Sequence, residues 1–304
     1  MAVFTTYNVT TNREDLSDVI KLLNPNNNWV YDNTKHGKAT ARYIEWPMDA
    51  LTTPTGNTNA VEGADSDDAA LTAATGGGNY CEITRVTGKI SNTQIKASTA
   101  GEHGTYEHQI MKSGKTWKNK VEFSIVTHTG AVSGTSAVAR QTKGLIGWIA
   151  TNTTTGASTA SNITEAEFND NLQLIWAQCG DPEGEINTIC GAYQKRRFSA
   201  FTGVSASAIT IPAEKKKVVS SITVIDTDFG LVNIHKHHVL NANAPDTIIT
   251  MFDMDCWELA FFRPPQEIKL ATVGDSRRFM IIGEYGIRSI QEKKSGKITG
   301  VKSS

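Results

Sequence analysis

The 304-residue sequence predicts an α+β fold in which helices and antiparallel strands are interspersed. Apolar residues recur at helical spacing in residues 102–128 and 164–179. Strand patterns rich in Val, Ile and Thr lie before and after these helices, without the strand–helix alternation of a parallel sheet. Residues 52–79, rich in Gly, Thr, Asn and Asp, separate two strand patterns, which predicts a long hairpin with an open tip.

The composition is that of a folded globular chain, with 39% hydrophobic residues, 20% charged residues and a net charge of −1. No window approaches the roughly 18 consecutive apolar residues of a membrane-spanning helix, so no membrane partner is expected. The N-terminus lacks a basic leader and an apolar core, so folding in a cytoplasm is expected. Two basic segments, 103–150 and 277–304, alternate with two acidic ones, which indicates either surfaces of opposite sign that meet within or between subunits or solvated faces that happen to differ.

Residues 1–34 are expected to form an N-terminal arm. Asn12 can cap a short helix, and Asn24-Pro25 ends it because proline disfavours helical geometry in the preceding residue. A helix of about three turns can bury its apolar side only against another element. That side consists of Leu16, Val19, Ile20 and Leu23.

Residues 36–46 and 80–97 are predicted to be the two strands of the hairpin. Neither face of the first strand is purely apolar, so it is expected to lie across a neighbouring subunit rather than inside one core. Its alternating faces are Thr40, Arg42, Ile44 and Trp46 on one side, and Ala39, Ala41, Tyr43 and Glu45 on the other. Three acidic residues, Asp65, Asp67 and Asp68, are expected to form a solvated tip, with a weak calcium site as the alternative.

Residues 102–128 predict one helix about 40 Å long. Its mid-helix Gly114 indicates either close packing or a bend, because glycine is unfavourable there. The expected buried face is Tyr106, Ile110, Gly114, Trp117, Val121 and His128. The expected charged face is His108, Lys112, Lys115, Asn119 and Glu122.

The second half mixes helices and strands. Thr164 and Glu167 predict a capping box and Gly180 the end of the helix over 164–179. A third helix is predicted over 186–203, and strands dominate from 217 onward, with a turn at 228–230 and a strand end at Pro264-Pro265. The apolar face of the helix over 164–179 is Phe168, Leu172, Ile175 and Trp176.

The sequence offers little catalytic chemistry, so no enzyme activity, cofactor or metal is expected. The histidine cluster at 235–238 is the best metal candidate, although a polar strand end is the simpler interpretation. The basic runs 195–197 and 215–217 are expected to be solvated, with non-specific phosphate contact as the alternative. Four cysteines without a CxxC pair are expected to be reduced and mostly buried, with disulfides under oxidising conditions as the alternative. They are Cys81, Cys179, Cys190 and Cys256.

Several stretches, in their order and spacing, resemble a capsid family found in phage and prophage genomes. The order of parts resembles the Hong Kong 97-type major capsid fold of tailed phages. The sequence departs from the family after Asn24-Pro25, where NNNWVYDN replaces a small apolar stretch, so the docking of the arm is not predicted. The matching stretches are NREDLSDVI (12–20), KATARYIEW (38–46), VEGAD (61–65), SNTQIKAST (91–99), KNKVEFSIV (118–126), VSGTSAVARQTKGL (132–145) and GEYGIRSIQEKKSGKITG (283–300).

The resemblance implies a major capsid protein of a tailed bacteriophage. It implies hexamers and pentamers that build an icosahedral shell around double-stranded DNA in the virion, assembled in the host cytoplasm. Implied partners are further copies, a portal protein, a separate scaffolding or decoration protein, and packaged DNA by non-specific contact. The implied division is an arm at 1–34, an E-loop hairpin at 35–98, a P-domain with a spine helix at 99–145, an A-domain at 146–262, and closing P-domain strands at 263–304.

Seven residues are candidates for assembly contacts by position and charge. They are Arg42, Tyr43, Trp46 and Glu62 on the hairpin, and Lys112, Lys115 and Glu122 on the spine helix. Replacing Trp46 with alanine is expected to impair assembly more than folding. No cleaved N-terminal segment is expected. The alternatives are an encapsulin-like compartment, a surface-binding decoration protein, and a metal-dependent hydrolase that uses the histidine cluster.

Overall fold

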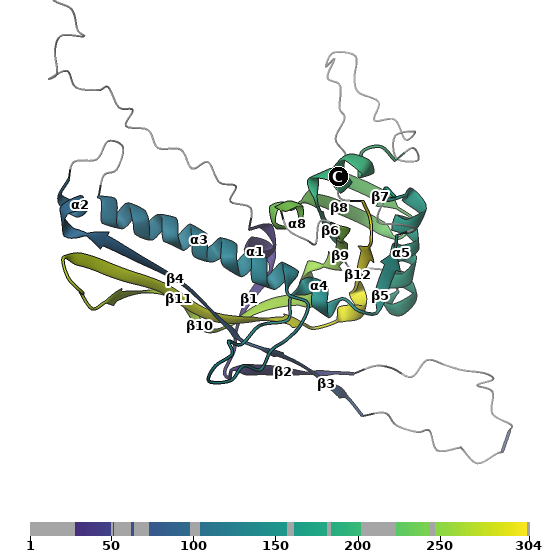
Figure 1. Cartoon of the computed structure of the whole chain (residues 1–304). Coiled ribbons are helices and arrows are strands. Elements are labelled where there is room, and N and C mark those ends of the chain that lie inside the picture. The colour runs from purple at the N-terminus through teal and green to yellow at the C-terminus, as the bar shows by residue number, and fades with distance from the viewer. Residues whose placement is uncertain are drawn as a thin grey trace, which may run out of the picture.

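The structure, a computed structural model, describes residues 28–49, 51, 62–63, 73–97, 104–156, 161–180, 184–201, 223–242 and 247–302. The helix predicted in the arm, the acidic residues 65–68 and the basic run 215–217 lie outside these residues. An elongated layer of four strands and one long helix joins a rounded part built on a six-stranded sheet (Figure 1). A two-stranded hairpin projects from the junction.

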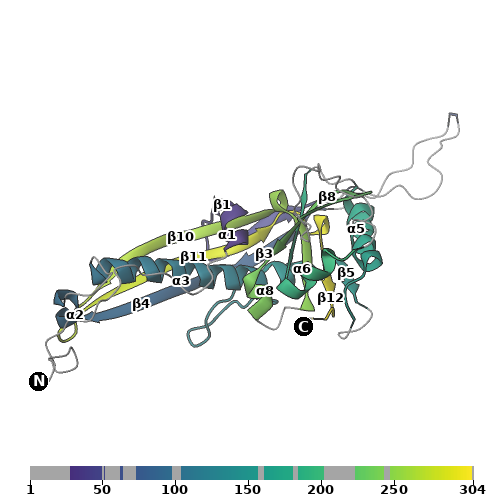
Figure 2. The same ribbon diagram turned by 90° about the horizontal axis from the view of Figure 1, so that it is seen from above.

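The elongated layer is a sheet covered on one face by helix α3, Thr105–Thr127 (Figure 2). The two central strands are antiparallel and long, while β1 is parallel to β10 and β4 is antiparallel to β11. In spatial order the strands are β1 (Lys35–Lys38), β10 (Trp257–Leu270), β11 (Ser276–Ser289) and β4 (Glu82–Ser91). The helix α2 (Asn92–Lys96) follows β4.

The long helix confirms the prediction over 102–128. It buries Trp117, Val121 and Ile125 against the sheet, as its apolar spacing predicts. A Cβ added at Gly114 would meet nothing closer than Ile281 at 3.9 Å. The proposal of close packing at Gly114 is therefore wrong, and this glycine has no steric role against the sheet.

The rounded part is a mixed six-stranded sheet flanked by short helices. In spatial order its strands are β5 (Asn152–Thr155), β12 (Ser295–Thr299), β9 (Ile249–Asp253), β6 (Ile186–Cys190), β8 (Gly230–Lys236) and β7 (Val224–Thr227). Its helical segments are α4 (Leu145–Trp148), α5 (Glu165–Cys179), α6 (Ala192–Phe198), α8 (His238–Ala242), η3 (Met254–Cys256) and η4 (Glu292–Lys294). Strand β12 belongs to this sheet although it follows the long strands of the other, so residues 263–304 contribute to both layers.

Helix α5 confirms the capping prediction in detail. The Thr164 side chain accepts from the Glu167 backbone, the Glu167 side chain accepts from the Thr164 backbone, and Gly180 follows the helix with a φ of 72°. One member of the predicted buried face is wrong, because Trp176 is 46% exposed and lies against Phe229 of the β7–β8 turn. That turn joins two antiparallel strands, as predicted.

Two predictions in the second half are wrong. The helix expected over 186–203 is the buried strand β6 followed by α6, and a short apolar run does not distinguish a buried strand from a helix. Pro264 and Pro265 do not end a strand, because β10 continues through them with register shifts around Arg263. Strand β1 ends opposite Phe261, so both prolines lie where the outer side of β10 has no partner among the described strands.

The predicted hairpin strands are also divided differently. Residues 36–46 belong to two strands, β1 and β2 (Tyr43–Met48), in different sheets. The predicted return strand splits at Cys81, since β3 (Thr75–Tyr80) pairs with β2 whereas β4 pairs with β11. Cys81 is buried and its N–H donates to the Arg42 carbonyl, which fixes this crossing point.

All four cysteines are free, and three of them are buried, as expected. Burial raises the pKa of the Cys81 thiol to about 11, and it raises the pKa values of Cys190 and Cys256 to about 12. These thiols are therefore protonated at neutral pH and poor nucleophiles. Cys179 is half-buried, and burial raises its pKa as well.

We expect Cys179 to react first with iodoacetamide in the folded chain at mildly alkaline pH. The buried thiols should react only after denaturation, because they are both inaccessible and protonated. Peptide mass spectrometry after timed labelling measures each site, and the same labelling in guanidinium gives the unfolded control. Rapid modification of Cys190 in the native chain would contradict the packing around β6.

Candidate functional site at the base of the hairpin

The hairpin is a two-stranded sheet whose inner face is anchored in its own subunit. Ile44 and Trp46 are each 6% exposed, and the Trp46 ring lies 5.3 Å from that of Trp148. Tyr43 and Glu45 point outward. The alternation of the sequence is therefore real, but its apolar face is buried at the hairpin base rather than offered to a neighbour.

The glycine run at 76–78, assigned by sequence to the loop, lies in β3 under two aromatic rings. A Cβ on Gly78 would come within 2.2 Å of the Tyr43 hydroxyl, and one on Gly77 within 2.8 Å of Trp46 Nε1. Register pairs Tyr43 with Tyr80, and their rings lie 4.6 Å apart. The missing side chains let the rings of β2 lie flat across β3, which explains why glycine interrupts this strand.

Asn79 fixes the hairpin base to two distant segments. Its Nδ2 group donates to the Ile287 carbonyl of β11 at 2.7 Å and, in the loop after α3, to Thr142 Oγ1 and the Lys143 carbonyl, both at 3.0 Å. Its Oδ1 accepts from the Lys143 N–H at 2.9 Å. The Asn79 side chain is fully buried, so its amide cannot bond to water and depends on these protein partners.

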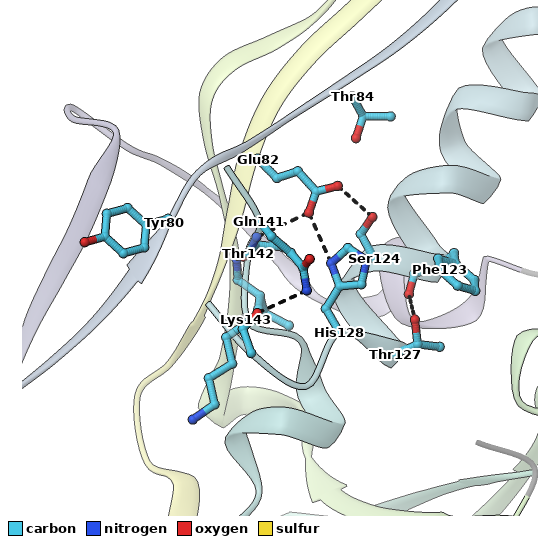
Figure 3. Close-up of polar contacts among 12 residues, drawn as sticks. Tyr80, Glu82, Thr84, Phe123, Ser124, Thr127, His128, Gln141, Thr142 and Lys143 are labelled. Atoms are coloured by element: carbon cyan, nitrogen blue, oxygen red, sulfur yellow. Dashed lines mark hydrogen bonds and ion pairs between the residues drawn. The ribbon is translucent and has the colours of Figure 1, made fainter. Parts of the chain in front are cut away.

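Glu82 makes a second junction (Figure 3), and it contacts Thr142, as Asn79 does. Ser124 Oγ donates to one carboxylate oxygen at 3.0 Å, and the Thr142 N–H donates to the other at 3.2 Å. His128 Nδ1 lies 3.2 Å from that second oxygen. The acid contacts both the hydroxyl and the imidazole, whereas a Ser-His-acid triad needs the histidine between them. The cluster ties β4, the end of α3 and the following loop together.

A third junction is built on Glu122, which is fully buried. Its Oε1 accepts from the Val30 N–H at 2.9 Å and lies 2.6 Å from His237 Nε2, while its Oε2 accepts from the Tyr31 N–H at 2.8 Å. The two N–H groups open helix α1 (Trp29–Asn33), where backbone donors lack intrahelical partners. The prediction that Glu122 lies on the exposed, charged face of the spine helix is therefore wrong, because Glu122 links three segments inside one subunit.

The histidine cluster serves the same junction. His235 stacks on Trp29 at 4.1 Å, and burial, assisted by the nearby Lys195 ammonium, lowers the pKa of His235 and favours its neutral form. His237 pairs with Glu122. Within the described ranges, no three His, Cys, Asp or Glu side chains gather to hold a metal ion. The departing stretch NNNWVYDN thus contains a helix that docks through aromatic rings.

The seven predicted contact residues divide into two groups. Five are at the surface and two, Trp46 and Glu122, are buried in their own subunit. The surface group is Arg42, Tyr43, Glu62, Lys112 and Lys115. Among the helices that the structure describes, none is long and apolar enough to cross a bilayer.

Comparisons with known proteins agree on one fold. A family model described as SU10 major capsid protein matches residues 3–302. The chain is similar to an encapsulin complex of Synechococcus elongatus PCC 7942, with 8% sequence identity and a TM-score of 0.63 over 100% of this chain and 98% of that chain. It is similar to a structure of Mycobacterium phage Adephagia, with 11% identity and a TM-score of 0.63 over 100% of this chain and 99% of that chain. It is also similar to the capsid of a native GTA particle, with 10% identity and a TM-score of 0.63 over 97% of this chain and 96% of that chain. Structural similarity at such low sequence identity shows the fold alone, and this fold is the Hong Kong 97 type. A search of curated proteins returns no match.

We expect Glu122→Ala to destabilise the unassembled chain by about 3–5 kcal/mol, because it strands a buried imidazole and two N–H groups. Urea unfolding measures the loss. The exposed Lys115→Ala on the same helix is the matched control and should change stability by less than about 1 kcal/mol. An unfolding curve of Glu122→Ala that overlays the wild type would show that this junction does not hold α1.

Trp46→Ala should lower stability by about 3–5 kcal/mol, since it empties a packed site at the hairpin base. Tyr43→Ala, from the same strand but 37% exposed, should cost less. This reverses the expectation that Trp46 matters more for assembly than for folding. Unfolding midpoints and particle yields compare the two variants. Normal stability with lost assembly in Trp46→Ala would mean that the ring reaches a neighbouring copy after all.

Proposed function

The chain belongs to the SU10 major capsid protein family, and we propose that its copies assemble into hexamers and pentamers of an icosahedral shell that encloses double-stranded DNA. In this role it builds the shell and catalyses no reaction. Its place is the virion, and assembly takes place in the host cytoplasm. The proposed partners beyond other copies are a portal protein, a separate scaffolding or decoration protein, and the packaged DNA.

The observation that carries the proposal is the hairpin β2–β3. It contains only two strands, and such a sheet is marginal in water without a surface to pack on. Its base is nevertheless held rigidly by Asn79 and Glu82, through contacts to the loop after α3. A projecting element with a fixed direction is suited to lie on a neighbouring subunit.

The outer face of the spine helix α3 supplies a second surface. Met111 is 65% exposed, and the nearby Lys112 and Lys115 form no ion pair within the described residues. An apolar side chain beside unpaired cations favours a partner surface that is acidic and partly apolar. Each such contact is weak, but a subunit that makes several at once is held strongly by their combined effect.

We propose the same four parts, an arm, an E-loop, a P-domain and an A-domain, with bounds that follow the sheets. The E-loop is the hairpin β2–β3, the P-domain is α3 with the four-stranded sheet, and the A-domain is the six-stranded sheet. Strands β1 and β4, which the sequence division put in the E-loop at 35–98, thereby move to the P-domain. A second candidate function is a protein-filled compartment, favoured by the similarity to the encapsulin complex over the full length of both chains.

Electron microscopy of the expressed full chain, with a mass measurement on the same sample, tests the shell. We expect closed uniform particles, or rings of five and six subunits, because the contacts are repeated on every copy. A monomer or dimer that never assembles, even with a scaffolding partner, would contradict the proposal. Particles that contain no DNA but enclose a cargo protein would favour the second candidate, the protein-filled compartment.

A further inference from the structure

An open pocket of about 670 Å³ lies beside the hairpin base. It is formed where the loop after α3 meets strands β10 and β11 and the segment that enters β2. The residues that line it are Arg42, Ser133, Gly134, Thr135, Ser136, Arg140, Phe262 and Glu284. It lies outside the three polar junctions built on Asn79, Glu82 and Glu122.

The pocket carries excess positive charge. Arg140, which lines the pocket, lies 2.5 Å from one oxygen of Glu284, whose side chain is 5% exposed. Arg263, which is not among the lining residues, lies 3.7 Å from the other oxygen. That carboxylate is therefore already shared by two guanidinium groups. Arg42 adds a third guanidinium, which is exposed and makes no ion pair with the described residues. The three charged residues that line the pocket, Arg42, Arg140 and Glu284, therefore leave an excess of one positive charge.

The wall of the pocket is a preformed turn that presents hydroxyl groups. Thr135 Oγ1 accepts from the N–H groups of Ala137 and Val138, and Gly134 adopts a φ of +70° that favours glycine. Ser133 and Ser136 flank this turn and line the pocket. Phe262, 41% exposed, adds an apolar surface. Guanidinium and hydroxyl donors beside a ring suit a carboxylate carried on a short, partly apolar segment.

The chain itself supplies a segment of this chemistry. Residues 43–84 contain seven acidic side chains and no lysine or arginine, whereas residues 123–164 contain no acidic side chain. Five of the acids lie between β2 and β3, and four of these are interspersed with alanine and glycine. They are Glu62, Asp65, Asp67 and Asp68. The hairpin and the loop that forms the pocket are thus oppositely charged by composition.

The two strands that carry this segment run away from the pocket. Tyr43 pairs with Tyr80 at the base, beside Arg42, and Met48 pairs with Thr75 at the far end. At about 3.4 Å per residue, the strands extend roughly 17 Å between these pairs. Figure 1 shows both strands running out from the junction. A second copy is therefore better placed than the same copy to receive the tip.

We propose that residues 61–68 of one copy dock in the Arg42–Arg140 pocket of a second copy, with a tip carboxylate bound by the Arg42 guanidinium and the serine hydroxyls. This inference rests on the proposed shell function and adds the receptor for the hairpin. It also predicts that the contact is electrostatic and weakens with salt, because Arg42 is solvent-exposed.

Zero-length cross-linking tests the contact in assembled particles of the full chain. Arg42→Lys supplies an amine, and a carbodiimide activates a carboxylate so that the two condense to an amide with loss of water. Particles are assembled from mixed light and heavy-nitrogen chains. We expect peptides that join position 42 to Glu62, Asp65, Asp67 or Asp68 and that combine both isotopes. Pairs of a single isotope only, or cross-links only to other carboxylates, would overturn the proposal.

Charge reversal gives an independent readout. Arg42→Glu alone, and Asp67→Lys with Asp68→Lys alone, should each raise the protein concentration needed for assembly about tenfold. Combining all three should restore it, because the pair is re-formed with opposite signs. Lys38→Glu, an exposed reversal on β1, is the matched control, and urea unfolding checks that each chain folds. Failure of the combination to recover would overturn the pairing.

The outcomes separate this inference from the proposed function. Shells that form normally, without mixed cross-links and without sensitivity to Arg42→Glu, would overturn the pocket and leave the shell intact. A wild-type chain that forms no particles would overturn both.

Discussion

The structure depends on one buried carboxylate. Glu122 lies near the end of the spine helix, and it receives the first free N–H groups of α1 and the imidazole of His237. Burying a charge is unfavourable by several kcal/mol unless strong donors surround it. Three donors do so here, two from α1 and one from the segment between β8 and α8, and no regular strand pairing joins these segments to α3. The carboxylate therefore sets where the chain enters β1, and hence where the hairpin begins.

The same principle recurs along the elongated layer. Glu82 joins β4 to the end of α3 and its following loop, and Glu284 joins β11 to that loop through Arg140. An elongated subunit has less interior than a sphere of equal size, so apolar burial alone cannot define every crossing point. Directional contacts to buried or half-buried carboxylates supply this definition, and they do so at the junctions from which the hairpin and the long loop emerge.

Local sequence patterns predicted the elements whose partners are near in sequence. The spine helix, the capping box of α5 and the β7–β8 turn follow from spacing within one segment. The errors arise where distant segments decide. Glu122 falls on the polar face by periodicity, but α1 covers that face. The run Gly76–Gly78 has the composition of a loop, yet the rings of Trp46 and Tyr43 in β2 require glycine at positions 77 and 78 of β3. Trp46 alternates as a hairpin residue should, and only Trp148 reveals that its face is buried.

The two prolines inside β10 have a consequence for the free subunit. Beyond Phe261 the outer side of β10 has no strand beside it among the described residues, and a long open edge invites pairing with any extended chain. Proline has no N–H to donate, and the register shifts at this point disturb the spacing that a new strand would need. The prolines and the irregular register therefore disfavour edge-to-edge pairing of one free subunit with another along this flank.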